Sequence, residues 1–156
     1  MGDITEALGL KAAGPFYRDW RFLTALLAGI GFWLSLGWFV PVKPIALWQI
    51  ATWRFVALSI WYPCAEELIF RGFVQGQLHH LSCGCRTWAG ISAANLITSV
   101  VFVLGHLWQH PAAWAVAVAV PSLVFGWFRD RHGSVYPCIV LHMFYNAGYF
   151  ALTGLP

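Results

Sequence analysis

The chain has 156 residues, 60% of them hydrophobic and 17% aromatic, with nine Lys and Arg, six Asp and Glu, and a mean hydropathy of +0.67. Soluble domains carry roughly a quarter charged residues, so a charged share of 10% excludes an ordinary soluble domain and predicts a multi-pass protein of the cell membrane. The net charge of +3 comes from basic residues scattered over short loops without a basic face, which excludes a nucleic-acid partner.

The length allows five or six transmembrane helices of ~20 residues, which predicts a single integral membrane domain over residues 1–156 with an all-α, polytopic helical bundle. Residues 1–21 mix acidic and basic side chains with a Gly-Pro pair and predict a polar lead-in. Residues 22–40 carry no charge and predict the first span. Residues 45–54 follow a proline-bounded turn and predict an interfacial or re-entrant piece.

The second span is predicted over residues 55–78. Pro63 interrupts it and supplies no backbone donor, so we expect a kink or a restart that frees carbonyl groups one turn earlier. Membranes tolerate such irregular backbone only where protein or a cavity surrounds it. The sequence therefore predicts protein or a cavity around the backbone just before Glu66.

Three further spans complete the predicted bundle. The last of them is followed by only a few residues. In chain order, the remaining segments are a polar link at 79–86, a span at 88–108, a span at 112–128 with a kink at Pro121, a charged turn at 129–133 and a span at 134–153.

The orientation of the bundle follows from its basic residues. If the N-terminus is cytoplasmic and the spans alternate, every Lys and Arg except Lys43 and Arg54 lies on the inner side. Such an excess of inner positive charge is typical of cytoplasmic loops. The sequence therefore predicts a cytoplasmic N-terminus.

The four cysteines contain no C-x-x-C pair. Cys83 and Cys85 are two residues apart and offer a soft metal two thiol ligands, but there is no second pair to complete a site. Reduced, structural thiols are the favoured interpretation.

The stretch from Glu66 to Arg71 places three charges between apolar runs. Glu67 and Arg71 are four residues apart with the acid nearer the N-terminus, the favourable order for an ion pair along a helix. Glu66 is rotated by about 100° from Glu67 and meets Phe70, not a base, at i+4. In an apolar setting such a carboxylate is protonated, meets a partner on another helix, or faces a water-filled cavity. Each outcome predicts a functional site.

Polar side chains at membrane depth recur on two later spans. His106 lies four residues after Phe102, and His142 lies four residues before Asn146, so each pair shares a helix face. Intramembrane ionisable groups predict a functional site that faces the bundle interior. Together with Glu66, they suit peptide hydrolysis, because a carboxylate takes a proton from water, an imidazole holds that water, and two donors stabilise an oxyanion.

Three motifs thus follow one another along the chain, and residues around the first and third extend the pattern. They are Glu66-Glu67-x-x-x-Arg71, Phe102-x-x-x-His106 and His142-x-x-x-Asn146, with Phe70-Arg71-Gly72 and Gly126 through Gly133-Ser134-Val135-Tyr136-Pro137 as flanks. Their order and spacing resemble those of the CPBP or Abi family, which includes the type II CAAX prenyl endopeptidases. The resemblance covers roughly residues 58–150.

The resemblance implies a glutamic intramembrane endopeptidase without a cofactor. The implied roles are Glu66 as general base on water, His106 as its partner, His142 and Asn146 as the oxyanion site, and Glu67, Arg71 and Phe102 as supporting residues. One Glu and two His also suit a catalytic zinc site, so a zinc-dependent form stays an open alternative. The absence of an HExxH motif and the presence of an asparagine favour the metal-free mechanism.

The implied partners are the lipid bilayer and a membrane-anchored protein or peptide substrate. Many members have about eight spans, and this chain has room for fewer. Compact bacterial members are associated with the processing of C-terminal sorting signals, which favours that substrate class over a prenylated one. A non-catalytic membrane binding or immunity protein is the alternative, because other members resemble bacteriocin self-immunity proteins.

The depth of the predicted site depends on where the spans begin. Straight spans place Glu66 near mid-depth and His106 near the outer end of its run. For the site to assemble, the third span begins after Trp88, or it tilts, or the Glu66 helix is displaced at Pro63. The sequence leaves all three open.

Overall fold

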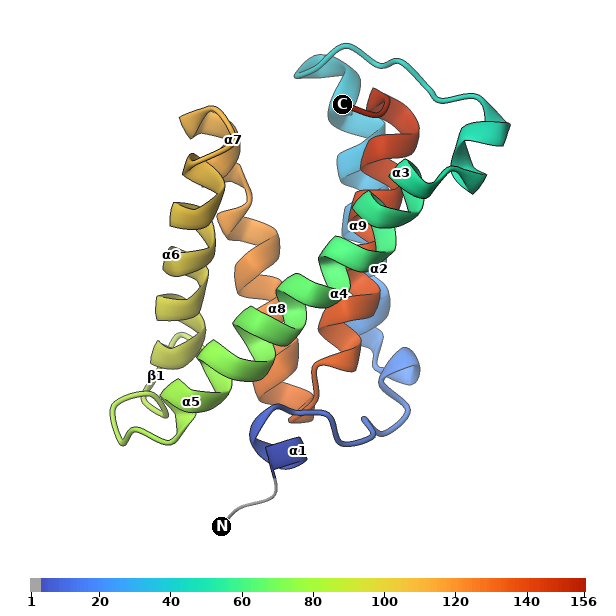
Figure 1. Cartoon of the computed structure of the whole chain (residues 1–156). Coiled ribbons are helices and arrows are strands. Elements are labelled where there is room, and N and C mark those ends of the chain that lie inside the picture. Colours follow the sequence, from blue (N-terminus) through green and yellow to red (C-terminus); the bar gives the residue numbers. More distant parts are fainter. Residues whose placement is uncertain (1–3) are drawn as a thin grey trace. The chain divides into compact units, whose positions relative to one another are not determined.

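The computed structural model describes residues 4–156, so the first three residues of the predicted lead-in lie outside it (Figure 1). The chain divides into two compact units, each made of two separated segments. The first unit comprises Met1–Gly14 and Glu66–Cys138, and the second comprises Pro15–Ala65 and Ile139–Pro156. The single domain expected from the sequence stays a prediction.

Helices dominate both units. The first unit contains α1 (Ile4–Ala7), the π-helix η5 (Leu68–Val74), α5 (Gln75–His79), β1 (Thr87–Trp88), β2 (Ile91–Ser92), α6 (Ala93–Leu107), α7 (Ala112–Ala117) and α8 (Ala119–His132). The second contains the 3-10 turns η1 (Phe16–Arg18), η2 (Leu36–Trp38) and η3 (Leu47–Ala51), the helices α2 (Trp20–Ser35) and α3 (Trp53–Val56), and the π-helix η4 (Ala57–Trp61). The chain passes between the units after Gly14, within α4 (Tyr62–Glu67) and within α9 (Tyr136–Thr153).

The all-α fold class is confirmed, apart from one hairpin of two-residue strands. Among residues 4–156, two helical stretches are long and apolar enough to cross a membrane, Trp20–Trp38 and Ala112–His132. A third apolar helix, Ala93–Leu107, is shorter. The first two lie close to the predicted spans at residues 22–40 and 112–128, and the predicted total of five or six spans stays a prediction.

Helix α6 has the polarity expected of a helix that faces lipid. Its buried face carries Asn95, Thr98 and Ser99, which are 3% exposed or less. In water the apolar face of a helix is the buried one, whereas polar side chains within a lipid-embedded bundle turn inward. The opposite face of α6 is apolar and exposed, with Leu96, Ile97, Val100 and Leu104 at 45 to 59% exposure.

The third helix begins later than its apolar run suggested, so the predicted start at Trp88 was wrong. Residues 87–92 instead form an antiparallel hairpin, in which Thr87 pairs with Ser92. Its two-residue loop, Ala89 and Gly90, has positive φ at both positions (50° and 81°), as tight hairpin loops require. Ser92 then caps α6 by accepting a hydrogen bond from the Asn95 amide at 2.9 Å.

The fourth run breaks into α7 and α8 at Val118, one turn before the expected kink at Pro121. Pro121 has no backbone N–H to donate to the carbonyl of Ala117, so the series of helical hydrogen bonds is interrupted there. The charged turn expected at residues 129–133 was also wrong, because α8 continues through His132. Gly133 ends it with a left-handed φ of 62°.

Helices α6 and α8 lie side by side in the first unit (Figure 1). The Asn95 side-chain amide donates to the carbonyl of Leu123 at 3.0 Å. Ser122 donates to the Ser99 hydroxyl, also at 3.0 Å. Gly126 permits this close approach, because a Cβ at that position would overlap the amide oxygen of Asn95.

We expect Gly126→Ala to destabilise the first unit by about 1–3 kcal/mol, because the added methyl group forces α6 and α8 apart. Thermal unfolding in detergent measures the loss. Gly105→Ala is the matched control, because no atom lies within 4 Å of a Cβ at this second helical glycine. An unchanged or slightly raised midpoint is expected for the control, and equal midpoints for both variants would contradict the packing argument.

In the second unit α9 packs along α2. The Tyr145 hydroxyl donates to the carbonyl of Ala25 at 2.8 Å, and the Trp33 and Phe144 rings lie 4.4 Å apart. The backbone amides of Lys43 and Ile45 donate to the carbonyls of Leu152 and Ala151 at 2.7 and 3.0 Å. These two bonds satisfy carbonyls that the end of a helix leaves open.

Candidate active site

The ion pair expected from the spacing of Glu67 and Arg71 is present in the first unit. Arg71 Nε lies 3.3 Å from Glu67 Oε2, and both side chains are fully buried. Arg71 Nη2 also donates to the carbonyl and the hydroxyl of Ser122, at 2.9 and 2.6 Å. The guanidinium carbon lies 4.8 Å from the ring centre of Phe102 and 5.5 Å from that of Phe125. Arg71 therefore ties η5 to both α6 and α8.

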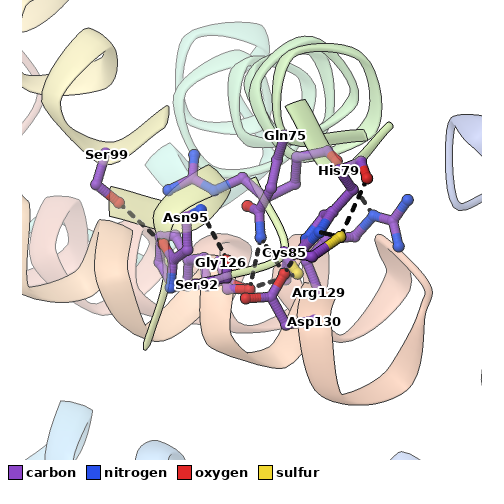
Figure 2. A network of polar contacts seen from close by, with 12 residues as sticks. Gln75, His79, Cys85, Ser92, Asn95, Ser99, Gly126, Arg129 and Asp130 are labelled. Carbon is purple, nitrogen blue, oxygen red and sulfur yellow. Dashed lines mark hydrogen bonds and ion pairs between the residues drawn. The ribbon is translucent and has the colours of Figure 1, made fainter. Parts of the chain in front are cut away.

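In the two helical turns that follow Arg71, a polar ladder joins the η5–α5 segment to α8 (Figure 2). Gln75 Nε2 donates to the Gly126 carbonyl at 2.9 Å and to Asp130 Oδ1 at 2.6 Å. His79 Nε2 lies 2.6 Å from the same Asp130 oxygen. Arg71, Gln75 and His79 thus follow one another at intervals of four residues, and so do their partners on α8. The first partner of each lies 51 residues later in the chain.

Sequence reasoning missed Gln75, Ser122 and Asp130. The available signal was a polar or glycine position at every fourth residue in both segments, at 71, 75 and 79 and at 122, 126 and 130. Such spacing places the residues on one helix face. It does not reveal which two faces meet.

Glu66 and His106 lie near a contact between two aromatic rings in the first unit. Phe70, four residues after Glu66, packs edge-on against Phe102 with ring centres 4.9 Å apart. The chain turns back between α5 and α6 through the β1–β2 hairpin, and the η5–α5 segment runs obliquely to α6 (Figure 1). Glu66 precedes Phe70 by one turn and His106 follows Phe102 by one turn. Each of the two residues is therefore one helical turn from a ring of this contact.

The imidazole of His106 is held against its own helix. Its ring centre lies 4.4 Å from that of Phe102, and Nδ1 lies 3.0 Å from the Phe102 carbonyl oxygen. When Nδ1 donates to that carbonyl, the lone pair of the neutral ring is on Nε2. This nitrogen of the half-buried ring is then able to accept a hydrogen bond from water.

In the second unit Asn146 compensates for the missing donor of Pro63. In the π-helix η4, the Tyr62 amide bonds to the carbonyl five residues earlier, that of Ala57. The next carbonyl, that of Leu58, would pair in the same way with residue 63, whose ring has no N–H. Asn146 Nδ2 donates to the Leu58 carbonyl instead, at 3.1 Å. His142, one turn earlier on α9, is 6% exposed.

We expect Asn146→Leu to destabilise the second unit by about 1–3 kcal/mol, because the Leu58 carbonyl loses its donor. In a Pro63→Ala background the same change should cost less, since an alanine at that position supplies a backbone N–H. Unfolding midpoints of the two single variants and the double variant measure the difference. An equal cost in both backgrounds would show that the Leu58 carbonyl does not depend on Asn146.

Irregular backbone was expected before Glu66, and the structure shows where it lies. The π-helix η4 precedes Pro63 in the second unit, and the π-helix η5 begins after Glu67 in the first. Short π-helical segments inside helices occur frequently at functional sites. The helix that carries Glu66 and Glu67 is therefore a candidate for a functional site.

The seven predicted site residues are divided between the units. Glu66, Glu67, Arg71, Phe102 and His106 belong to the first, and His142 and Asn146 belong to the second. Their meeting in one pocket is therefore a proposal. Within the described residues, no three His, Cys, Asp or Glu side chains are grouped as in a metal site.

Three comparisons with known proteins complete the description of the site. Residues 47–148, more than half of the chain, match the family model described as type II CAAX prenyl endopeptidase Rce1-like. That range contains all seven predicted site residues. The comparisons with curated proteins and with solved structures found no match.

Proposed function

Because the chain belongs to the type II CAAX prenyl endopeptidase Rce1-like family, a family of membrane-embedded proteases, we propose that it is a glutamic intramembrane endopeptidase. It hydrolyses a peptide bond of a membrane-anchored protein. The observation that carries the proposal is the Phe70–Phe102 contact, which joins the helical turn after Glu66 to the helical turn before His106. A carboxylate and an imidazole in that arrangement suit the activation of one water molecule.

Glu66 is the general base of the proposed reaction. Its carboxylate takes a proton from water while His106 Nε2 orients the same molecule. The resulting hydroxide attacks the carbonyl carbon of the scissile bond and gives a tetrahedral intermediate. Protonated Glu66 then returns the proton to the leaving amine, and the C–N bond breaks.

His142 and Asn146 form the proposed oxyanion site. An asparagine amide has two N–H donors, and the Leu58 carbonyl uses only one of them. The bond to Leu58 fixes the direction of the amide, so the second donor is pre-oriented. Donors fixed before the reaction stabilise the charge of the intermediate without reorganisation.

Glu67, Arg71 and Phe102 position the base without touching the substrate. The buried Glu67–Arg71 pair and its bonds to Ser122 hold the start of η5 against α8. The Phe102 ring contacts both the Arg71 guanidinium and the His106 ring. The neighbouring Glu66 therefore emerges from a segment that has little freedom to rotate.

The proposed setting is a bundle of five or six spans in the cell membrane with a cytoplasmic N-terminus. The proposed substrate is a protein whose C-terminal sorting signal ends in an apolar tail that anchors it. An active site that is open toward the bilayer can receive such a tail directly from the lipid. The chain in this proposal acts as one domain.

A cleavage assay in lipid vesicles tests the function. The purified chain and a peptide with a polar segment followed by an apolar anchor are incubated, and mass spectrometry identifies new termini. We expect one cleavage site and the same rate in the presence of 1,10-phenanthroline. Loss of activity with the chelator and recovery with zinc would replace the metal-free mechanism by the zinc-dependent one. No cleavage of any anchored peptide would favour a binding or immunity role.

A further inference from the structure

A second cluster of reactive side chains lies in the first unit at the end of α5 (Figure 2). It consists of Cys85, His79 and Asp130. Cys85 Sγ lies 3.9 Å from His79 Nδ1 and 3.2 Å from the carbonyl oxygen of His79. His79 Nε2 lies 2.6 Å from Asp130 Oδ1. A thiol, an imidazole and a carboxylate thus follow one another, with the carboxylate orienting the imidazole.

This order is the arrangement that activates a nucleophile. An adjacent base takes the proton of the thiol, and a third group holds the base in the required tautomer and orientation. Asp130 is itself held by Gln75, whose fully buried side chain donates to it at 2.6 Å. The His79 ring is therefore anchored from the side opposite the thiol.

Asp130 favours the protonated form of His79. The hydrogen bond to Asp130 raises the pKa of His79 above its usual value of 6.5, against the opposing effect of partial burial. An imidazolium beside a thiol stabilises the thiolate, the reactive form of cysteine. Asp130 and Cys85 are the charged groups that act on His79.

The cluster lies near the end of a helical stretch that is long and apolar enough to cross a membrane. Asp130 is two residues from the end of the apolar stretch Ala112–His132. Two large apolar side chains that flank the cysteines, Leu81 and Trp88, are 52% and 83% exposed. Exposed Trp next to a span is typical of the lipid headgroup region. Cys85 is exposed beside them, so its thiol is accessible from the interface.

We propose that Cys85, His79 and Asp130 form a nucleophilic thiol site that accepts an acyl group from a long-chain acyl thioester at the membrane surface. The Cys85 thiolate attacks the thioester carbonyl carbon, and a new C–S bond forms. The C–S bond to the carrier breaks, and its sulfur takes the proton held by His79. The reaction converts one thioester into another and needs no oxidant or reductant. Cysteines beside membrane spans are the usual acceptors of such acyl groups.

The chain supplies its own control. Cys83 is also exposed and lies two residues away in the same loop. The full chain in phosphatidylcholine vesicles is incubated with palmitoyl-coenzyme A, and peptide mass spectrometry follows hydroxylamine-labile acylation of each cysteine. We expect Cys85 to react at least about tenfold faster than Cys83 and His79→Gln to remove the difference, as loss of a general base implies.

Two results would overturn the proposal. Equal acylation of Cys83 and Cys85 in the unaltered chain would show that the thiol is not activated. Rapid alkylation of Cys85 by iodoacetamide without acylation would show that the thiol is activated but does not accept an acyl group. The comparison of the two cysteines needs no variant, so it holds even if His79→Gln impairs folding. Neither readout depends on peptide cleavage.

Discussion

Glu66→Gln is expected to abolish peptide cleavage while leaving the protein folded and inserted. Glutamine has nearly the same size and shape as glutamate, but its amide cannot take a proton from water. General base catalysis contributes about 10²- to 10⁴-fold to rates. We therefore expect kcat to fall by at least about 100-fold. The unfolding midpoint should change little, because Glu66 is only half-buried and takes no part in the Glu67–Arg71 pair.

The same change at Glu6 provides the control for this prediction. Glu6 is an exposed acid in the lead-in, where it pairs with Lys11 at 3.2 Å. Glu6→Gln should leave both the cleavage rate and the unfolding midpoint unchanged, since surface pairs contribute about 0–1 kcal/mol. Normal turnover by Glu66→Gln would end the assignment of the general base. The polar motifs would then be interpreted as contacts between helices.

Features that depend on local geometry were predictable from the sequence. The Glu67–Arg71 pair follows from the spacing of one helix turn, and the structure places the two groups in contact. The first span follows from a run without charge, and the structure has an apolar helix over Trp20–Trp38. In both cases the decisive residues lie within one helix.

Features that depend on the meeting of distant segments were not predictable. Gln75 and Asp130 lie 55 residues apart, and their contact depends on the register between α5 and α8. The hairpin at residues 87–92 was missed because its apolar residues continue the pattern of α6. Ser92 was the local signal that α6 begins later, because serine is a favoured N-cap. Of the three arrangements left open for His106, the structure shows a later helix start, at Ala93.

The site residues illustrate the same division. Helical spacing predicts that Phe102 and His106 share a face, and their rings are in contact. The release of a carbonyl by Pro63 was also predictable from the sequence. Its acceptance of a hydrogen bond from Asn146 was not, because the donor lies 88 residues away from Leu58.

Arg71→Met is expected to cause the largest loss of stability. Methionine fills much of the same space but leaves the fully buried Glu67 without its ion pair with Arg71. The variant also loses both hydrogen bonds to Ser122. Breaking a buried pair by removing one partner costs about 3–5 kcal/mol. For a chain of this size we expect the unfolding midpoint to fall by about 6–20 °C.

Lys11→Met is the matched control, because it removes the base from an exposed ion pair with a similar N–O distance, 3.2 Å against 3.3 Å. The side chains of Lys11 and Glu6 are 50% and 70% exposed, against 0% for Arg71 and Glu67. Water replaces the lost partner at the surface, so the midpoint should fall by no more than about 4 °C. Similar shifts for Lys11→Met and Arg71→Met would contradict the burial argument.

The double variant Glu67→Gln/Arg71→Met separates a structural role of the pair from a chemical one. Removing both charges eliminates the buried carboxylate that has lost its ion pair with Arg71, so the double variant should be more stable than Arg71→Met alone. Because Glu66 and His106 are unchanged, a positioning role predicts that cleavage returns together with stability. If stability returned and cleavage did not, Arg71 or Glu67 would have to act on the reacting groups themselves. We expect the two properties to recover together, since the contacts of Arg71 are all with the protein framework at Glu67, Ser122, Phe102 and Phe125.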